Sequence, residues 1–82
     1  MKIKLNPYVC YRYESRIKGG KSFIFHLEYG KIYLSNFEAY KILEFIDFYS
    51  PDTYDLYCEF DGVHVKSFIK DMVDNEVLYY EN

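Results

Sequence analysis

The hydrophobic pattern of the chain changes its period at Ser35. Before this residue, three short runs alternate apolar and polar residues, as half-buried strands do. After it, apolar residues recur every three or four positions, which is typical of amphipathic helices. The pattern predicts an α+β fold, in which a three-stranded antiparallel β-meander precedes three helices in a winged helix-turn-helix-like arrangement. The expected strands cover residues 8–14, 22–28 and 31–34, and residues 77–80 are expected to form an extended tail.

Each expected strand alternates its side chains between two faces, and we assign the more apolar face to the core. Gly19-Gly20 and Tyr29-Gly30 supply the two turns between the strands. A meander in chain order leaves the third strand with one unpaired edge. The residues expected to point inward from the second and third strands are Phe23, Phe25, Leu27, Ile32 and Leu34.

Three helices are expected after the strands. Ser35-Asn36-Phe37-Glu38 fits the S-x-x-E capping box, so a first helix should start there and run to about residue 48 or 49. Ser50-Pro51 is expected to open a short second helix that ends near residue 60. Asp61-Gly62 should separate it from a third helix that runs from about residue 63 to 75. The expected core stripes are Ala39, Ile42, Leu43 and Ile46, then Leu56 and Phe60, then Val65, Phe68, Ile69, Met72 and Val73.

The size and charge of the chain restrict its function. With 82 residues, it is expected to form a single domain over residues 1–82, too small for an enclosed active site. Residues 1–35 carry seven Lys and Arg against two Glu, whereas residues 36–82 carry three Lys against eleven carboxylates. A basic sheet beside acidic helices can orient a charged peptide or a partner enzyme. The chain has no apolar run long enough for a signal peptide or a membrane span, so we expect a soluble, cytoplasmic protein.

No set of residues in the sequence has the spacing of a catalytic or metal site. A phosphate loop, an H-E-x-x-H motif and a nucleophile elbow are all missing from the sequence, so we expect no enzymatic activity and no cofactor. His26 and His64 are expected to be separate surface or capping residues. Cys10 and Cys58 have no C-x-x-C partner, and we expect buried thiols in a reducing cytosol. The carboxylates do not follow the order of a calcium loop.

Two other classes of protein are compatible with this order of elements. The helices could form a winged helix-turn-helix that reads DNA, but Lys66 and Lys70 in the third helix are outnumbered by Asp71, Asp74 and Glu76. DNA-reading helices need excess positive charge, so binding to nucleic acid is disfavoured. An adaptor of the structural or toxin-antitoxin type could instead self-associate through the free strand edge. We otherwise expect a monomer or a weak dimer.

The free strand edge and the third helix together suit the capture of an extended peptide. An edge strand offers backbone N–H and C=O groups to an added strand, and a nearby apolar helix offers pockets for alternate side chains. On the helix, we expect Val65, Phe68 and Met72 to contact the peptide, and we expect Ile69 and Val73 to belong more to the core.

The order of elements resembles the PqqD-like family of leader-peptide recognition elements over nearly the whole chain. The resemblance rests on Gly30-Lys31-Ile32-Tyr33-Leu34-Ser35-Asn36, which looks like the family's glycine turn, third strand and helix start. It rests also on the first-helix stripe from Ala39 to Ile46, on the short helix around Leu56, and on the apolar stripe of the closing helix.

This resemblance implies a non-catalytic protein that presents a ribosomally made precursor peptide to a modifying enzyme. The leader of the precursor would add as an antiparallel strand beside the third strand and pack against the third helix. Small standalone relatives look most like the leader-binding proteins of lasso-peptide biosynthesis, whose partner is a cysteine protease. A protein closer to PqqD itself would serve a radical S-adenosylmethionine enzyme. Carried over by position, the leader-binding residues are Lys31, Ile32, Tyr33, Leu34, Val65, Phe68, Ile69 and Met72.

Overall fold

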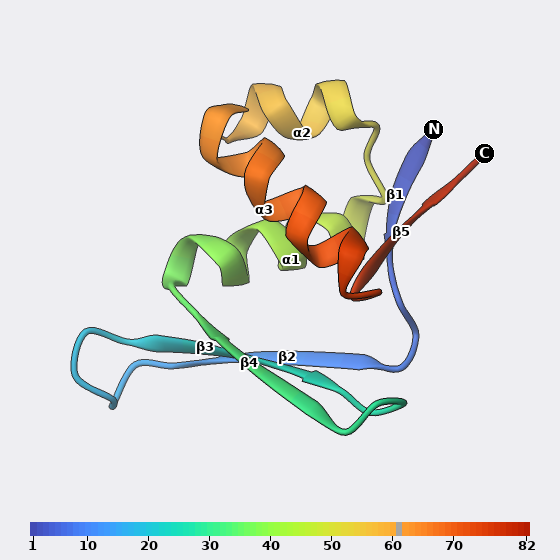
Figure 1. Ribbon diagram of the computed structural model, residues 1–82. Coiled ribbons are helices and arrows are strands. Elements are labelled where there is room, and N and C mark those ends of the chain that lie inside the picture. Colours follow the sequence, from blue (N-terminus) through green and yellow to red (C-terminus); the bar gives the residue numbers. More distant parts are fainter. Residues whose placement is uncertain (61) are drawn as a thin grey trace.

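The computed structural model describes residues 1–60 and 62–82, without the side chain of Val63, and confirms the α+β fold (Figure 1). The expected break at Asp61 lies outside the described residues, and Gly62 begins the third helix. The strands are β1 (Lys2–Leu5), β2 (Val9–Glu14), β3 (Lys21–His26), β4 (Lys31–Ser35) and β5 (Leu78–Glu81). The helices are α1 (Phe37–Tyr49), α2 (Thr53–Glu59) and α3 (Gly62–Asp74).

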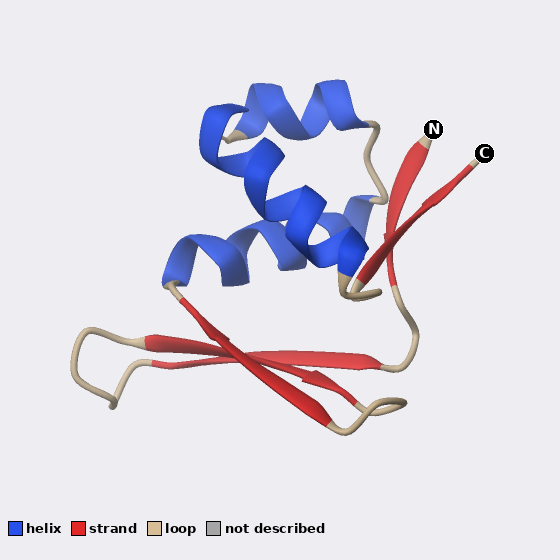
Figure 2. Ribbon diagram, viewed as in Figure 1, coloured by secondary structure: helices blue, strands red, loops and turns tan. Residues whose placement is uncertain are grey.

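The strands β2, β3 and β4 form the expected antiparallel meander, with β3 in the centre. Figure 2 shows all three helices on one side of this sheet. The predicted stripe of α1 is confirmed, because Ala39, Ile42, Leu43 and Ile46 are all buried. Together with Ile24 of β3 and apolar residues of α2 and α3, these side chains form the core between the sheet and the helices.

A second, two-stranded sheet was not predicted. The N-terminal strand β1 pairs with the C-terminal strand β5 in antiparallel register, with Ile3 opposite Tyr80 and Leu5 opposite Leu78. The two chain ends therefore lie side by side (Figure 1). Ile3 and Leu78 are buried in the main core. The tail is extended as expected, but its partner is β1, so it leaves the edge of β4 unoccupied.

The assignment of strand faces was wrong. Ser22, Ile24 and His26 are the buried residues of β3, and Leu27, just after it, is exposed. In β4 the expected inward residues are the outward ones, since Ile32 is 61% exposed and Leu34 is 65% exposed.

The reason for this reversal is that the two polar residues of the buried face have backbone partners. The Ser22 hydroxyl donates to the carbonyl of Asn36, and the His26 ring contacts the carbonyl of Glu76. A buried polar group costs little when it is hydrogen-bonded, so this face can carry the Ser22 hydroxyl and the Nε2 atom of His26. The other ring nitrogen of His26, Nδ1, is buried without a hydrogen-bond partner in the described part of the chain. Because this face carries hydrogen-bonded polar residues, the number of apolar residues on each face did not identify the buried face of the sheet.

The helix ends also differ from the expected ones. Asn36 caps α1, and its side-chain oxygen accepts a hydrogen bond from the Ala39 N–H at 2.9 Å. Ser35 ends β4 instead. Ser50 does not cap α2 but ends α1 in the left-handed conformation, with a φ of 44°, and Asp52 precedes α2.

This assignment of the cap predicts a difference between two neighbouring variants. Asn36→Ala removes the acceptor for the Ala39 N–H and should lower the free energy of unfolding by about 1 kcal/mol. Ser35→Ala should have a smaller effect, because Ser35 does not cap the helix. Urea unfolding followed by circular dichroism measures both. A larger loss for Ser35→Ala would contradict the cap at Asn36.

The described helices include none with the length and hydropathy needed to cross a membrane. Both thiols are free and exposed, so the expectation that Cys10 and Cys58 are buried was wrong. His64 is exposed, as expected for a residue at a helix start.

An exposed ion cluster lies at the end of the β2–β3 hairpin. The Glu14 carboxylate accepts hydrogen bonds from the Arg16 side chain, at 2.8 Å, and from Arg12, at 3.2 Å. The Arg16 hydrogen bonds are the main cause that lowers the pKa of Glu14 from 4.5 to about 2.

A carboxyl with a lowered pKa in the folded state stabilises the fold above its unfolded pKa and loses this contribution as the pH falls. The stability of the chain should therefore include a contribution from Glu14 that fades between pH 4.5 and about 2. When the pH is lowered over this range, the melting temperature of Glu14→Gln should therefore fall less than that of the natural chain, as thermal unfolding measures. Equal acid losses for Glu14→Gln and the natural chain would contradict the role of Glu14.

Candidate functional site: the free edge of β4

β4 is the edge strand that the sequence predicted. It pairs with β3 on one side, with Tyr33 opposite Ile24 and Lys31 opposite His26. Among the described residues, no strand pairs with its other side. The strand order β2-β3-β4 puts β4 at the border of the sheet, and Figure 1 shows β4 leading into α1. An edge of this kind is a template for an added strand.

The register shows which backbone groups point out from this edge. The N–H of Leu27 donates to the carbonyl of Tyr8 at 2.9 Å, so Tyr8 and Leu27 form a hydrogen-bonded pair. The next pair along the ladder is Val9 and His26, which is therefore non-hydrogen-bonded. The two kinds of pair alternate along an antiparallel ladder, so Ile24, two residues before His26, also belongs to a non-hydrogen-bonded pair with β2. Its backbone N–H and C=O groups therefore point away from β2 and toward β4. Its partner in β4, Tyr33, turns its backbone groups back toward β3. Ile32 and Leu34 therefore present their N–H and C=O groups at the free edge.

The outward side chains of the sheet form an apolar surface, which we call the outer face. It consists of Phe23, Phe25, Ile32 and Leu34. Phe25 lies opposite Ile32, and Phe23 lies opposite Leu34. The two Phe rings stack, with their centroids 6.2 Å apart. A shallow cleft of about 290 Å³ extends this surface to Ile17 and Arg12. Exposed apolar surfaces of this kind mark interaction sites.

On the side of β4 that faces the helices, the accessible residues differ from those expected to line a peptide-binding groove. Tyr33 is half-buried and its hydroxyl reaches the side chain of Asn75, just after α3, at 3.4 Å. Val65 and Met72 were expected to contact a peptide, but they are 0% and 8% exposed and belong to the core. Ile69 is 1% exposed and belongs to the core, as its position in the stripe indicated, although the resemblance implied that it binds the leader.

Phe68 is half-buried and Lys31 is exposed. Of the eight residues singled out in the sequence, the four in β4 lie together along the free edge, while Phe68 is the most accessible of the four in α3.

A polar cluster around the buried His26, which the sequence did not reveal, ties the β3–β4 turn to the end of α3. The expectation that His26 is a surface or capping residue was wrong, because His26 is 1% exposed and its Nε2 lies 3.1 Å from the carbonyl oxygen of Glu76. Asn6 donates to the same carbonyl at 2.7 Å. Tyr29 stacks on the His26 ring, with the centroids 4.5 Å apart, and donates its hydroxyl to the Glu76 carboxylate. This hydrogen bond is the main cause that raises the pKa of Tyr29 to about 12. The cluster holds the base of β4 in place.

The described residues give no support to a nucleic-acid or metal site. In α3, Lys70 pairs with Asp74 at 2.8 Å, and Lys66 lies over the ring of Tyr57. No three His, Cys, Asp or Glu side chains in the described part of the chain are grouped to hold a metal ion. Comparison of the chain with protein-family models, with curated proteins and with solved structures finds no match in any of the three.

Proposed function

We propose that this chain binds an extended peptide as an additional strand along β4. The observation that carries this proposal is the open edge, where Ile32 and Leu34 present free backbone groups beside an exposed apolar face. Main-chain hydrogen bonds would supply affinity, and side-chain contacts would select the register.

The edge geometry gives the bound peptide an alternating pattern. Peptide residues directly opposite Ile32 and Leu34 exchange hydrogen bonds with them, and their side chains lie on the same side of the sheet. These two positions of the peptide should therefore be apolar, because they extend the outer face. The residue between them is opposite Tyr33 and points toward the helices. An apolar-x-apolar triplet is the expected core of the recognised segment.

The resemblance to PqqD-like proteins supports a leader segment of a ribosomally made precursor as the peptide. In this function the chain performs no catalysis and presents the precursor to a modifying enzyme. Its resemblance to small standalone leader-binding proteins favours a cysteine protease of the lasso-peptide type as that enzyme over a radical S-adenosylmethionine enzyme. The complex would form in the cytoplasm, where precursor peptides are synthesised.

Fluorescence polarisation with labelled synthetic leaders tests this function. The leaders are taken from short precursors encoded next to the gene, and a peptide-display library tests peptide binding in general. Saturable binding to one leader, lost when the apolar-x-apolar triplet is changed to Ser-x-Ser, is the expected result. Display peptides that bind β4 while every leader fails would refute the leader as ligand. Failure of both would refute peptide capture.

A further inference from the structure

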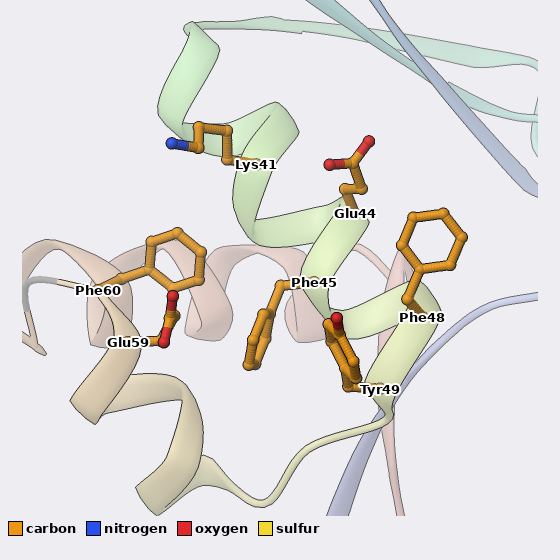
Figure 3. Close-up of a pocket in the computed structure, with 7 residues that line it drawn as sticks. All are labelled: Lys41, Glu44, Phe45, Phe48, Tyr49, Glu59 and Phe60. Atoms are coloured by element: carbon orange, nitrogen blue, oxygen red, sulfur yellow. The ribbon is translucent and has the colours of Figure 1, made fainter.

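A second concave surface lies between α1 and α2, and no residue of β4 takes part in it. This cleft, which we call the helix cleft, has a volume of about 460 Å³ (Figure 3). It is large enough for one long side chain of a partner. Its lining residues are Lys41, Glu44, Phe45, Phe48, Tyr49, Glu59 and Phe60.

Aromatic rings make up most of the apolar lining of the helix cleft. Figure 3 shows Phe45 standing between Phe60 and Tyr49. The rings of Phe45 and Phe60 are 5.7 Å apart and nearly perpendicular, and those of Phe45 and Tyr49 are 4.9 Å apart. Tyr49 and Phe48 are 69% and 71% exposed. The rings of Phe48 and Tyr49 are therefore accessible from solvent, whereas Phe45 and Phe60 also pack against the core.

The charge at the helix cleft is negative and unbalanced. Glu44 and Glu59 lie at its border, and neither forms an ion pair within the described part of the chain. The one lining cation, Lys41, lies over the ring of Phe37, 5.6 Å from its centroid. Tyr40 donates a hydrogen bond to Glu44 at 3.2 Å, which fixes that carboxylate and raises the pKa of Tyr40.

The helix ends add to this negative character. The last turns of α1 and α2 contain no basic residue, so the partial negative charge of their carbonyl ends is not offset there.

We propose that the helix cleft binds a positively charged side chain, Lys or Arg, presented by a basic segment of a partner protein. Aromatic faces attract cations, and the attraction is strengthened when carboxylates lie at the same site. The occupant should be positively charged, because Glu44 and Glu59 have no ion-pair partner among the described residues and because the exposed aromatic rings attract cations. This surface is separate from the edge of β4, so the chain can hold a peptide and a basic partner at once.

The experiment is a titration of the whole ¹⁵N-labelled chain with four blocked pentapeptides, Gly-Ser-X-Ser-Gly, followed by amide chemical shifts. X is Arg, Lys, citrulline or norleucine, so that the last two match the shape without the charge. The Arg and Lys peptides should shift amide signals of α1 and α2 saturably and at least about tenfold more tightly than the two neutral peptides. Equal binding of the norleucine or citrulline peptide would overturn the proposal, as would the absence of shifts with both charged peptides.

Variants locate the site and separate it from the peptide edge. The double substitution Glu44→Gln with Glu59→Gln should weaken binding of the charged peptides about fivefold or more. Glu38→Gln, an exposed carboxylate in the first turn of α1, is the matched control and should leave binding unchanged. Binding of a β4 peptide should be the same in the double variant and the natural chain. Undiminished binding of the charged peptides to the double variant would overturn the proposal.

Discussion

Substitution of Leu34 or Ile32 by proline is expected to abolish peptide binding while the chain remains folded. Each proline removes one N–H that the free edge offers to an added strand, and its ring obstructs the approach of that strand. Proline is tolerated at edge positions whose N–H faces solvent, so the sheet should survive. The loss of a main-chain hydrogen bond together with the steric obstruction should reduce affinity by at least about 30-fold. Fluorescence polarisation measures the affinity, and circular dichroism verifies the fold.

Tyr33→Pro is the matched control, because it lies between the two positions in the same strand. The backbone of Tyr33 faces β3, opposite Ile24, so proline there removes a hydrogen bond inside the sheet. We expect the free energy of unfolding to fall by about 1–3 kcal/mol, because a carbonyl of β3 loses its hydrogen-bond partner, whereas the two edge variants should lose much less. If Tyr33→Pro folded normally and the edge variants did not, the backbone orientation derived for β4 would be incorrect.

The second large effect is expected for His26→Ala. This change removes a buried ring that contacts the Glu76 carbonyl and stacks on Tyr29, and it leaves a cavity beneath the turn. We expect the free energy of unfolding to fall by about 2–4 kcal/mol. Because the ring holds the base of β4, peptide affinity should also fall at temperatures well below the melting temperature.

His64→Ala is the control for this effect, since His64 is exposed at the start of α3. Its effect on stability should be within about 0.5 kcal/mol. Urea unfolding of both variants distinguishes the two histidines. Similar stabilities for the two variants would contradict the burial of His26.

The order of the elements could be predicted because local patterns determine it. In α1, four apolar residues at helical spacing from Ala39 to Ile46 indicate both the helix and its buried side, and the structure buries all four. Glycines after residues 18 and 29 mark the turns, and Gly19, Gly20 and Gly30 all adopt positive φ. These features depend on residues that are close in sequence.

The buried face of the sheet could not be predicted in the same way. Both faces of β3 carry apolar residues, and the choice between them depends on distant backbone carbonyls at Asn36 and Glu76 that accept hydrogen bonds from Ser22 and His26. The partner of the C-terminal tail is also non-local, because β5 pairs with residues at the opposite end of the chain. No pattern within either segment identifies the other.

Only part of the candidate site could be predicted, because some of its features depend on residues that are distant in sequence. The edge position of β4 follows from the meander, and its four residues lie on the free edge strand as predicted, although Ile32 and Leu34 point outward instead of inward. The stripe of α3 can be recognised from spacing, but spacing does not show which of its residues the core uses. Val65 and Met72 are buried in the same core cluster as Ile24 of β3 and Leu43 of α1. The apolar side chains left for a peptide at the edge of β4 are those of the outer face.

Amide hydrogen exchange at three neighbouring residues of β4 tests the central claim most directly. In the free chain, the amide hydrogens of Ile32 and Leu34 should exchange rapidly, whereas that of Tyr33 should be protected by β3. Saturation with a bound peptide should protect Ile32 and Leu34 as well. Slow exchange at Ile32 and Leu34 in the free chain, or unchanged exchange there in a saturated complex, would contradict a peptide strand on this edge.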